Sequence, residues 1–206
     1  MAGLFIFEGP DGVGKTSTIN EVEKRLHIAG QDCVCLSFPG KEQGTIGAHI
    51  YKLHHDLARY DVSQISQLSL QLLHVAAHVD AIEQKILPML GEGKTVLLDR
   101  YWWSTWAYGI AADIPAPQLE AIMTIERLVW RGVIPTTLFL LSRQQSLVPT
   151  HLAHVYKDLV RQESDNYPVI AIKNEDTVDS ISEEVAQLIL TATCAEQHSL
   201  AGVPIT

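Results

Sequence analysis

Short apolar runs alternate along this chain of 206 residues with longer stretches in which apolar residues recur every three or four positions. The short runs predict five strands. They cover Leu4 to Phe7, Cys33 to Leu36, Thr95 to Leu98, Thr137 to Leu141 and Val169 to Ile172. This alternation is typical of an α/β fold in which helices cover both faces of a parallel sheet.

The periodic stretches predict the helices. In order, these are a helix of about four turns that ends at Gly30, a helix from Ile46 to Leu57, a longer helix that opens near Asp61 or Ser63 and continues to Ile86, and helices over Pro117–Trp130, Thr150–Gln162 and Ser180–Thr193. No linker or repeat interrupts the series, so we expect a single domain over residues 1–193. Residues 194–206 are predicted to form a frayed tail.

The composition narrows the class of protein. Apolar residues make up 47% of the chain and charged residues 19%, which excludes bulk disorder. The 24 acidic residues outnumber the 15 basic ones and give a formal charge of -9. A general nucleic-acid-binding surface needs a net basic face, so we expect no nucleic-acid partner, although a local basic pocket remains compatible with this charge.

The cysteines and the apolar runs indicate the compartment. Cys33, Cys35 and Cys194 are too few for a disulfide framework and favour reduced thiols. The first residues lack the basic region of a signal peptide, and no apolar run reaches the length of about 18 residues that a membrane span requires. We therefore expect a cytoplasmic protein without a membrane partner.

A glycine-rich motif follows the first predicted strand and leads into the first predicted helix. The segment Gly9-Pro-Asp-Gly-Val-Gly14-Lys15-Thr16 satisfies G-x-x-x-x-G-K-[ST]. Its glycines let backbone N–H groups surround phosphate oxygens, Lys15 reaches the outer phosphates, and Thr16 offers a hydroxyl to Mg²⁺. The motif predicts a nucleoside triphosphate site, against the alternative of a glycine-rich turn with an exposed lysine.

A second charged motif ends the third predicted strand. Asp99, Arg100 and Tyr101 leave the carboxyl edge of the sheet, where open α/β folds place their ligands. Asp99 could hold Mg²⁺ through water, and Arg100 could bind a phosphate with both guanidinium nitrogens. The alternative is a surface Asp–Arg pair that caps the next turn.

Together these segments resemble the thymidylate kinase family. The matching text is Phe7-Glu8-Gly9-Pro-Asp11-Gly-Val-Gly-Lys15-Thr16, then Phe38-Pro39, Leu72-Leu73 and Ile86-x-Pro88-x-Leu90-x-x-Gly93-x-x-Val96-x-x-Asp99-Arg100-Tyr101-x-x-Ser104-x-x-Ala107-Tyr108. The resemblance implies a P-loop NTPase-type three-layer fold and a cytoplasmic kinase that uses ATP and Mg²⁺. It also implies a place in nucleotide biosynthesis.

The resemblance also implies roles for individual residues. Asp11 would contact the sugar 3′-hydroxyl, Arg100 would bind the acceptor monophosphate, and Tyr108 would pack where a ribose 2′-hydroxyl would lie. Lys41 stands where the family has an arginine, three residues after Phe38. The expected ATP-binding residues are Gly9, Asp11, Gly12, Val13, Gly14, Lys15, Thr16, Ser17 and Asn174, with Thr16 and Asp99 toward the metal.

The expected base pocket departs from the family pattern. His74 and His78 replace a stacking phenylalanine and a base-reading arginine, and Thr105 stands where many members have a small amide. Two histidines four residues apart could hold a metal, could be ordinary polar residues, or could form a pocket for a different or modified base. The acceptor-binding set is Asp11, Phe38, Lys41, His74, His78, Arg100, Thr105 and Tyr108.

The expected lid is short. Family members without an arginine in the phosphate loop carry an arginine-rich segment after the fourth strand, whereas this chain offers only Ser142 to Pro149 with Arg143. Arg143 would be the catalytic charge beside Lys15, Asp99 and Arg100, with Arg161 in reserve. Its alternative is a solvated residue at a strand end.

These observations lead to one preferred function and two alternatives. The chain is expected to transfer the γ-phosphoryl group of ATP to a deoxynucleoside monophosphate, with dTMP as the default acceptor. The alternatives are a kinase for another base or a nucleotide-like compound, and a degenerate nucleotide-binding protein.

Three tryptophans follow the Asp99–Arg100–Tyr101 motif, at positions Trp102, Trp103 and Trp106. Their side chains could form a wall of the acceptor site, or they could pack a helix on its neighbour. The resemblance to the family also implies a homodimer.

Overall fold

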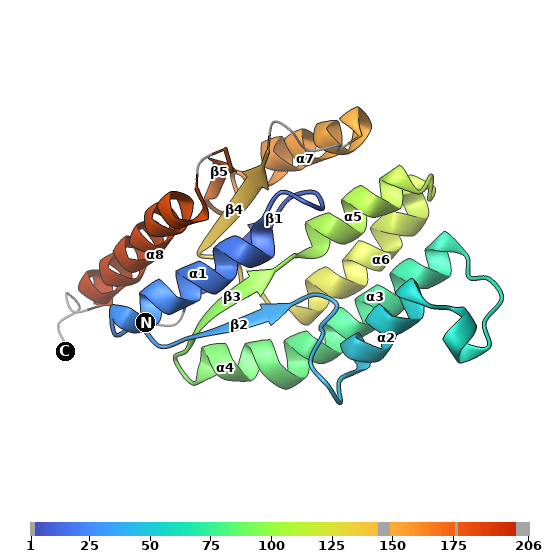
Figure 1. Cartoon of the computed structure of the whole chain (residues 1–206), viewed down its shortest axis with the longest axis horizontal. Coiled ribbons are helices and arrows are strands. Elements are labelled where there is room, and N and C mark those ends of the chain that lie inside the picture. Colours follow the sequence, from blue (N-terminus) through green and yellow to red (C-terminus); the bar gives the residue numbers. More distant parts are fainter. Residues whose placement is uncertain (1–2, 144–148, 176, 201–206) are drawn as a thin grey trace.

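The computed structural model describes residues 3–143, 149–175 and 177–200, and its centre is a parallel sheet. Its strands are β1 (Leu4–Glu8), β2 (Cys33–Ser37), β3 (Thr95–Asp99), β4 (Thr137–Ser142) and β5 (Val169–Lys173), in the spatial order β2-β3-β1-β4-β5 (Figure 1). All five predicted strands are confirmed, each one residue longer at its carboxyl end.

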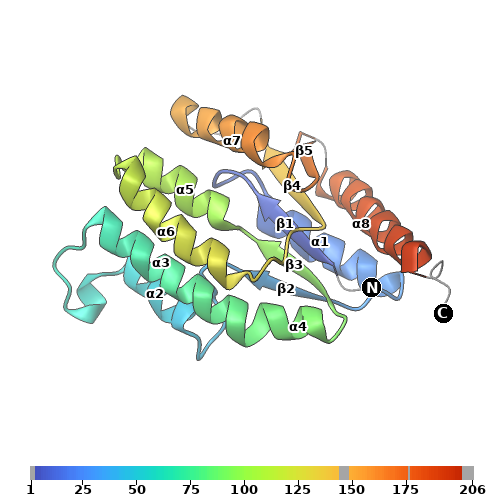
Figure 2. The same cartoon turned by 180° about the vertical axis from the view of Figure 1, so that it is seen from behind.

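Helices connect the strands in sequence. They are α1 (Lys15–Ile28), α2 (Ile46–His55), α3 (Gln67–Ala81), α4 (Leu87–Gly91), α5 (Trp102–Ala111), α6 (Ala116–Val129), α7 (Thr150–Glu163) and α8 (Val178–Leu200). Helices α1 and α8 cover one face of the sheet, and α3 to α7 cover the other (Figures 1 and 2). The three-layer arrangement expected from the sequence is therefore confirmed. None of the helices in the described ranges is long and apolar enough to cross a bilayer.

Several helix boundaries differ from the prediction, including the start of α3 and the end of α8. Helix α3 begins at Gln67, because the Ser66 side chain accepts a hydrogen bond from Ser69 N at 3.1 Å and caps it there. Asp61 instead ends a short 3₁₀ turn with a φ of 55°, so neither Asp61 nor Ser63 opens the helix. Helix α8 continues to Leu200, past Cys194, where the sequence predicted a tail. Residues 201–206 lie outside the described residues.

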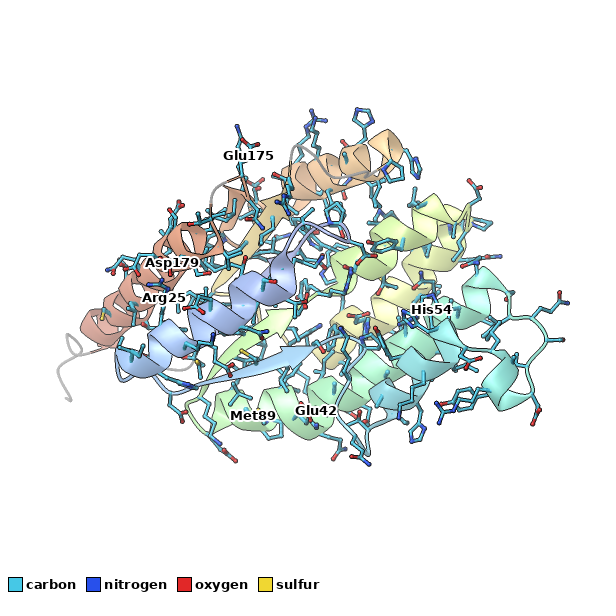
Figure 3. All side chains as sticks on the ribbon, in the orientation of Figure 1. Arg25, Glu42, His54, Met89, Glu175 and Asp179 are labelled. Carbon is cyan, nitrogen blue, oxygen red and sulfur yellow. The ribbon has the colours of Figure 1, made fainter. Side chains whose placement is uncertain are left out.

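The sheet separates two apolar cores because side chains alternate along β1. Leu4 and Ile6 pack with α3, α5, α6 and α7, whereas Phe5 and Phe7 pack with α1 and α8. Every residue of β1 and β3 is buried, as expected for central strands of a parallel sheet. On the second face, Arg25 of α1 also forms ion pairs with Asp179 and Glu183 of α8 (Figure 3).

The register of the central strands brings the two charged motifs to one edge. Phe7 of β1 pairs with Asp99 of β3, and Ser37 of β2 pairs with the same Asp99. The segments that follow β1, β2 and β3 therefore leave the sheet side by side. This edge is the carboxyl end of the sheet, where parallel α/β folds bind ligands.

Candidate active site

The phosphate loop spans Gly9 to Thr16 between β1 and α1. Gly9 has a φ of 135°, and a Cβ there would lie 2.3 Å from the carbonyl oxygen of Leu141. Gly14, with a φ of 90°, is the N-cap of α1, and no side chain caps the first turn of that helix. The first N–H groups of α1 are thus available for an anion, as the glycine-rich motif predicts.

Asn174 fixes the loop from the end of β5. This buried side chain donates from Nδ2 to the carbonyl oxygen of Val13 at 2.5 Å. A Cβ at Gly14 would lie 2.3 Å from the same Nδ2, so only glycine fits there. Asn174 therefore shapes the loop backbone, while its predicted role in ATP binding stays a prediction.

Lys15 occupies the centre of the loop. Its ammonium group donates to the carbonyl oxygens of Gly9 and Pro10, each at 2.7 Å. Burial, together with the positive charge of Arg100, lowers the pKa of Lys15 to about 8. The lysine is held by neutral carbonyl oxygens that a phosphate can replace, and a phosphate would also raise its pKa again.

Thr16 and Asp99 form a set of oxygen ligands at the mouth of the loop. The Thr16 hydroxyl donates to Asp99 Oδ2 at 3.0 Å. Asp99 Oδ1 is enclosed by protein and has no hydrogen-bond partner among the described residues. An enclosed, unpartnered carboxylate oxygen beside a hydroxyl fits Mg²⁺, which prefers oxygen ligands. Ser17, the next residue of α1, is exposed.

Glu8 is the buried charge behind the loop. Its Oε1 accepts hydrogen bonds from the backbone N–H groups of Tyr101 at 2.7 Å and Ser104 at 3.0 Å. Its Oε2 accepts from Gly9 N at 3.0 Å, from the Ser104 hydroxyl at 2.9 Å and from the Tyr156 hydroxyl at 3.3 Å. Burial raises the pKa of Glu8, and the charges of Arg100 and Lys15 oppose that rise.

Arg100 connects this carboxylate to the open side of the site. It has a φ of 77°, a strained value for a non-glycine residue, and its guanidinium donates to the Ser104 hydroxyl at 2.9 Å and to Asp11 Oδ1. Asp11 Oδ2 accepts from the Tyr108 hydroxyl at 2.8 Å. Although burial acts in the opposite direction, Arg100 and Tyr108 lower the pKa of Asp11.

A cavity of about 540 Å³ opens beside Arg100. Its lining includes all eight residues assigned to acceptor binding, namely Asp11, Phe38, Lys41, His74, His78, Arg100, Thr105 and Tyr108. Lys41 lies over the ring of Tyr51, with its ammonium 5.1 Å from the ring centroid. The structure thus brings the set together in one place, while the binding role of each residue stays a prediction.

His74 lies close to two other histidine rings, those of His54 and His78. Burial, together with repulsion from His78, His54 and Arg100, lowers the pKa of His74 to about 3. Its Nε2 lies 3.2 Å from Nδ1 of His54 on α2, a residue that also lines the cavity and is labelled in Figure 3. The described residues contain no group of three or more His, Cys, Asp or Glu side chains that could hold a metal.

His78 has different surroundings from His74. Its ring stacks on Phe38, with centroids 4.0 Å apart and planes at 10°, and its Nδ1 lies 3.1 Å from Oε2 of Glu126 on α6. Both side chains are buried. The alternative that His78 is an ordinary polar residue explains why Nδ1 has a hydrogen-bond partner within the protein. The ring nevertheless lines the cavity.

Comparison with known proteins assigns the family. Residues 7–147, more than half of the chain, match the family model described as thymidylate kinase. The chain belongs to the thymidylate kinase family.

Individual relatives show how far the likeness extends. The chain is 37% identical to thymidylate kinase from Chlorobium limicola over 123 residues, which is 59% of this chain and 53% of that protein. It is 35% identical to thymidylate kinase from Bartonella quintana over 143 residues, 68% of this chain and 63% of that protein. The match thus spans between about half and two thirds of these relatives.

A crystal structure of thymidylate kinase from Ehrlichia chaffeensis has a similar fold. Its TM-score is 0.72 at 20% identity, and the likeness covers 91% of this chain and 98% of that one. The parallel sheet with surrounding helices is therefore the fold of this family.

Other predicted residues lie apart from the cavity. Arg143 follows β4 and is exposed, and residues 144–148 of the expected lid lie outside the described residues. Arg161 on α7 pairs with Asp158 at 3.1 Å. Trp102 and Trp103 are buried in the core and do not line the cavity, which favours helix packing over an acceptor wall.

Several site residues received no role from the sequence, among them Glu8, Gln71 and Glu126. Glu8 belongs to the segments that resemble the family but was assigned no role, and neither Gln71 nor Glu126 was predicted as a site residue. Gln71 is buried and lines the cavity. A signal for Glu126 existed, because it continues the buried α6 positions Leu119, Ile122 and Met123 at helical spacing. A carboxylate on an apolar helix face requires a partner, although the sequence alone does not identify that partner as His78.

Replacing Glu8 tests the network behind the loop. In Glu8→Gln the NH₂ group of the amide would face at least two of the N–H or O–H groups that donate hydrogen bonds to the carboxylate. We expect the free energy of unfolding to fall by about 2–4 kcal/mol, measured by urea unfolding. Glu184→Gln, at an exposed position of α8, is the matched control and should leave stability unchanged. Equal stability of the two variants would contradict the network.

Proposed function

We propose that this chain is a deoxynucleoside monophosphate kinase that catalyses ATP + dTMP → ADP + dTDP. The observation that carries the proposal is the adjacency of two sites for phosphate. The phosphate loop and the Arg100 side chain lie on one sheet edge, linked through Glu8, and the 540 Å³ cavity opens beside Arg100. Such an arrangement suits two nucleotides whose phosphates meet.

The donor would bind at the loop. Backbone N–H groups of Gly12, Val13 and Gly14 and the first turn of α1, including Ser17, would surround the phosphates of ATP, and Lys15 would move from its carbonyl partners to them. Thr16 and Asp99 would hold Mg²⁺, which neutralises phosphate charge when bound.

The acceptor would bind in the cavity. Arg100 would bind the monophosphate with both nitrogens, with Lys41 as a second, single-point charge. Asp11 would then release Arg100 and accept a hydrogen bond from the sugar 3′-hydroxyl. The Tyr108 ring would occupy the space that a ribose 2′-hydroxyl requires, which favours deoxynucleotides.

Transfer itself would need position and charge more than covalent chemistry. The γ-phosphoryl group passes through a loose transition state whose charge lies on its equatorial oxygens. Lys15 and Arg100 would stabilise that charge from opposite sides, and Arg143 would add a third cation from the end of β4.

Assembly and compartment follow from the same proposal. Leu72 on α3 and Ile125 and Leu128 on α6 are exposed apolar side chains, which supports a homodimer through these helices. The reaction that we propose would place the enzyme in the cytoplasm, with ATP and the acceptor as its partners.

An ADP-release assay with a panel of monophosphates tests the reaction. We expect ADP release that depends on dTMP. In Lys15→Ala the rate of ADP release should fall by at least about 100-fold, because the cation that contacts the phosphates is removed. Lys24→Ala, at an exposed position of α1, is the matched control. A preferred acceptor other than dTMP would indicate a base pocket adapted to another base, and nucleotide binding without any turnover would contradict the kinase.

The variant Arg143→Ala tests the proposed third cation in the same assay. Turnover within about threefold of the unaltered chain would remove Arg143 from the mechanism.

The pH dependence of ATP binding tests the state of Lys15. Without ligand this group has a pKa of about 8, so it loses its charge as the pH rises through that value. Because ATP binds the charged form, binding above that pH should take up a proton, and the dissociation constant should rise by up to about tenfold per pH unit. Calorimetry in buffers of different ionisation enthalpy measures both effects. Affinity that stays constant between about pH 7.5 and 9.5 would contradict the assignment.

A further inference from the structure

Glu126 is a carboxylate in an otherwise apolar helix face. It is fully buried on α6, and its Oε1 has no hydrogen-bond partner in the described part of the chain. Its Oε2 lies 3.1 Å from Nδ1 of His78. An ionised carboxylate with one partner is costly to bury unless that partner carries the opposite charge. Glu126 and His78 must therefore be considered as a pair.

The His78 ring is held in one orientation. It stacks on Phe38 on one side and contacts Glu126 through Nδ1. The Nε2 atom lies on the side of the imidazole away from Nδ1, and it has no hydrogen-bond partner in the described ranges, nor is it among the enclosed polar atoms. Because His78 lines the 540 Å³ cavity, Nε2 is the ring nitrogen left to hydrogen-bond a ligand there.

The number of protons on the pair decides what Nε2 offers. Three arrangements leave the pair without a net charge. In the first, ionised Glu126 accepts from a doubly protonated His78; in the second, a neutral Glu126 carboxyl donates a hydrogen bond from Oε2 to Nδ1, and the ring proton lies on Nε2. Nε2 carries a hydrogen in both. In the third, Nδ1–H donates to Oε2 and the carboxyl proton lies on Oε1, which has no hydrogen-bond partner in the described part of the chain, so a buried O–H would stay unsatisfied. An unprotonated Nε2 therefore requires either that unsatisfied donor or a pair with a net negative charge, and both are costly to bury.

We propose that Glu126 is a positioning residue that keeps His78 Nε2 as a hydrogen-bond donor toward the acceptor base, so that the site selects pyrimidines with a carbonyl rather than an amino group at position 4. The inference rests on the proposed function for the identity of the acceptor. A donor at this position meets the O4 carbonyl of thymine or uracil favourably and opposes the amino group that cytosine carries instead.

Binding of dUMP and dCMP tests the selection, because their bases have nearly the same size and differ at the edge in question. Titration calorimetry should show dUMP and dTMP binding about 10-fold or more tightly than dCMP. In His78→Phe, which keeps a ring against Phe38, the preference should fall to about threefold or less. The double variant His78→Phe/Glu126→Leu removes the unpaired carboxylate and should give the same result in a stable protein. His27→Phe, an exposed position at the end of α1, is the control.

Glu126→Leu separates positioning from simple packing. With His78 intact but unpaired, the preference for dUMP over dCMP should fall, and KM for the acceptor should rise while the dissociation constant for ATP stays unchanged. Nitrogen NMR of the histidine rings, assigned by comparison with His78→Phe, should show a protonated Nε2 at neutral pH in the unaltered chain. A preference that survives in Glu126→Leu, or an unprotonated Nε2, would overturn the inference.

The outcomes also separate this inference from the kinase activity. Selective, His78-dependent binding of dUMP without turnover would contradict the kinase and support the donor. Phosphorylation of dCMP as efficiently as dUMP would support a kinase and overturn the donor.

Discussion

The buried carboxylate of Glu8 is the interaction on which the rest of the site depends. A fully buried acidic group is costly unless its oxygens accept hydrogen bonds, and here the donors come from the phosphate loop, the Asp99–Arg100–Tyr101 segment, the first turn of α5 and Tyr156 of α7. Four segments are thereby fixed around one group at the end of β1. Because the Ser104 hydroxyl bonds both Glu8 and Arg100, the same carboxylate sets the position of the guanidinium.

The charges of the site are paired within the protein in a way that substrates can exchange. Lys15 is held by two carbonyl oxygens, and Arg100 by Asp11 and Ser104. Each cation is thus positioned before any phosphate arrives, and a phosphate needs only to replace these acceptors. A chain with a formal charge of -9 can in this way present cations to a phosphate, because Lys15, Lys41 and Arg100 lie at one edge of the sheet.

The sequence predicts most of this architecture because local patterns determine it. The strands and the phosphate loop follow from apolar runs and a motif, the acceptor set follows from the resemblance to the family, and the register of β1 with β3 brings Asp99 and Arg100 to the loop. The start of α3 at Ser66 could not be predicted with the same certainty, because several short polar residues could cap it. The contacts between Glu126 and His78, and between Asn174 and Val13, join residues 48 and 161 positions apart, and no local pattern reveals such pairs.

A crystal structure with a compound that joins adenosine and thymidine through a phosphate chain tests the central claim most directly. The account predicts that the chain of phosphates runs from the loop to Arg100, that Lys15 has left the carbonyl oxygens of Gly9 and Pro10 for a phosphate, and that Glu8 keeps its donors while Asp11 releases Arg100. A thymidine half outside the cavity, or phosphates that bypass Arg100 while Lys15 stays on its carbonyl partners, would contradict the account.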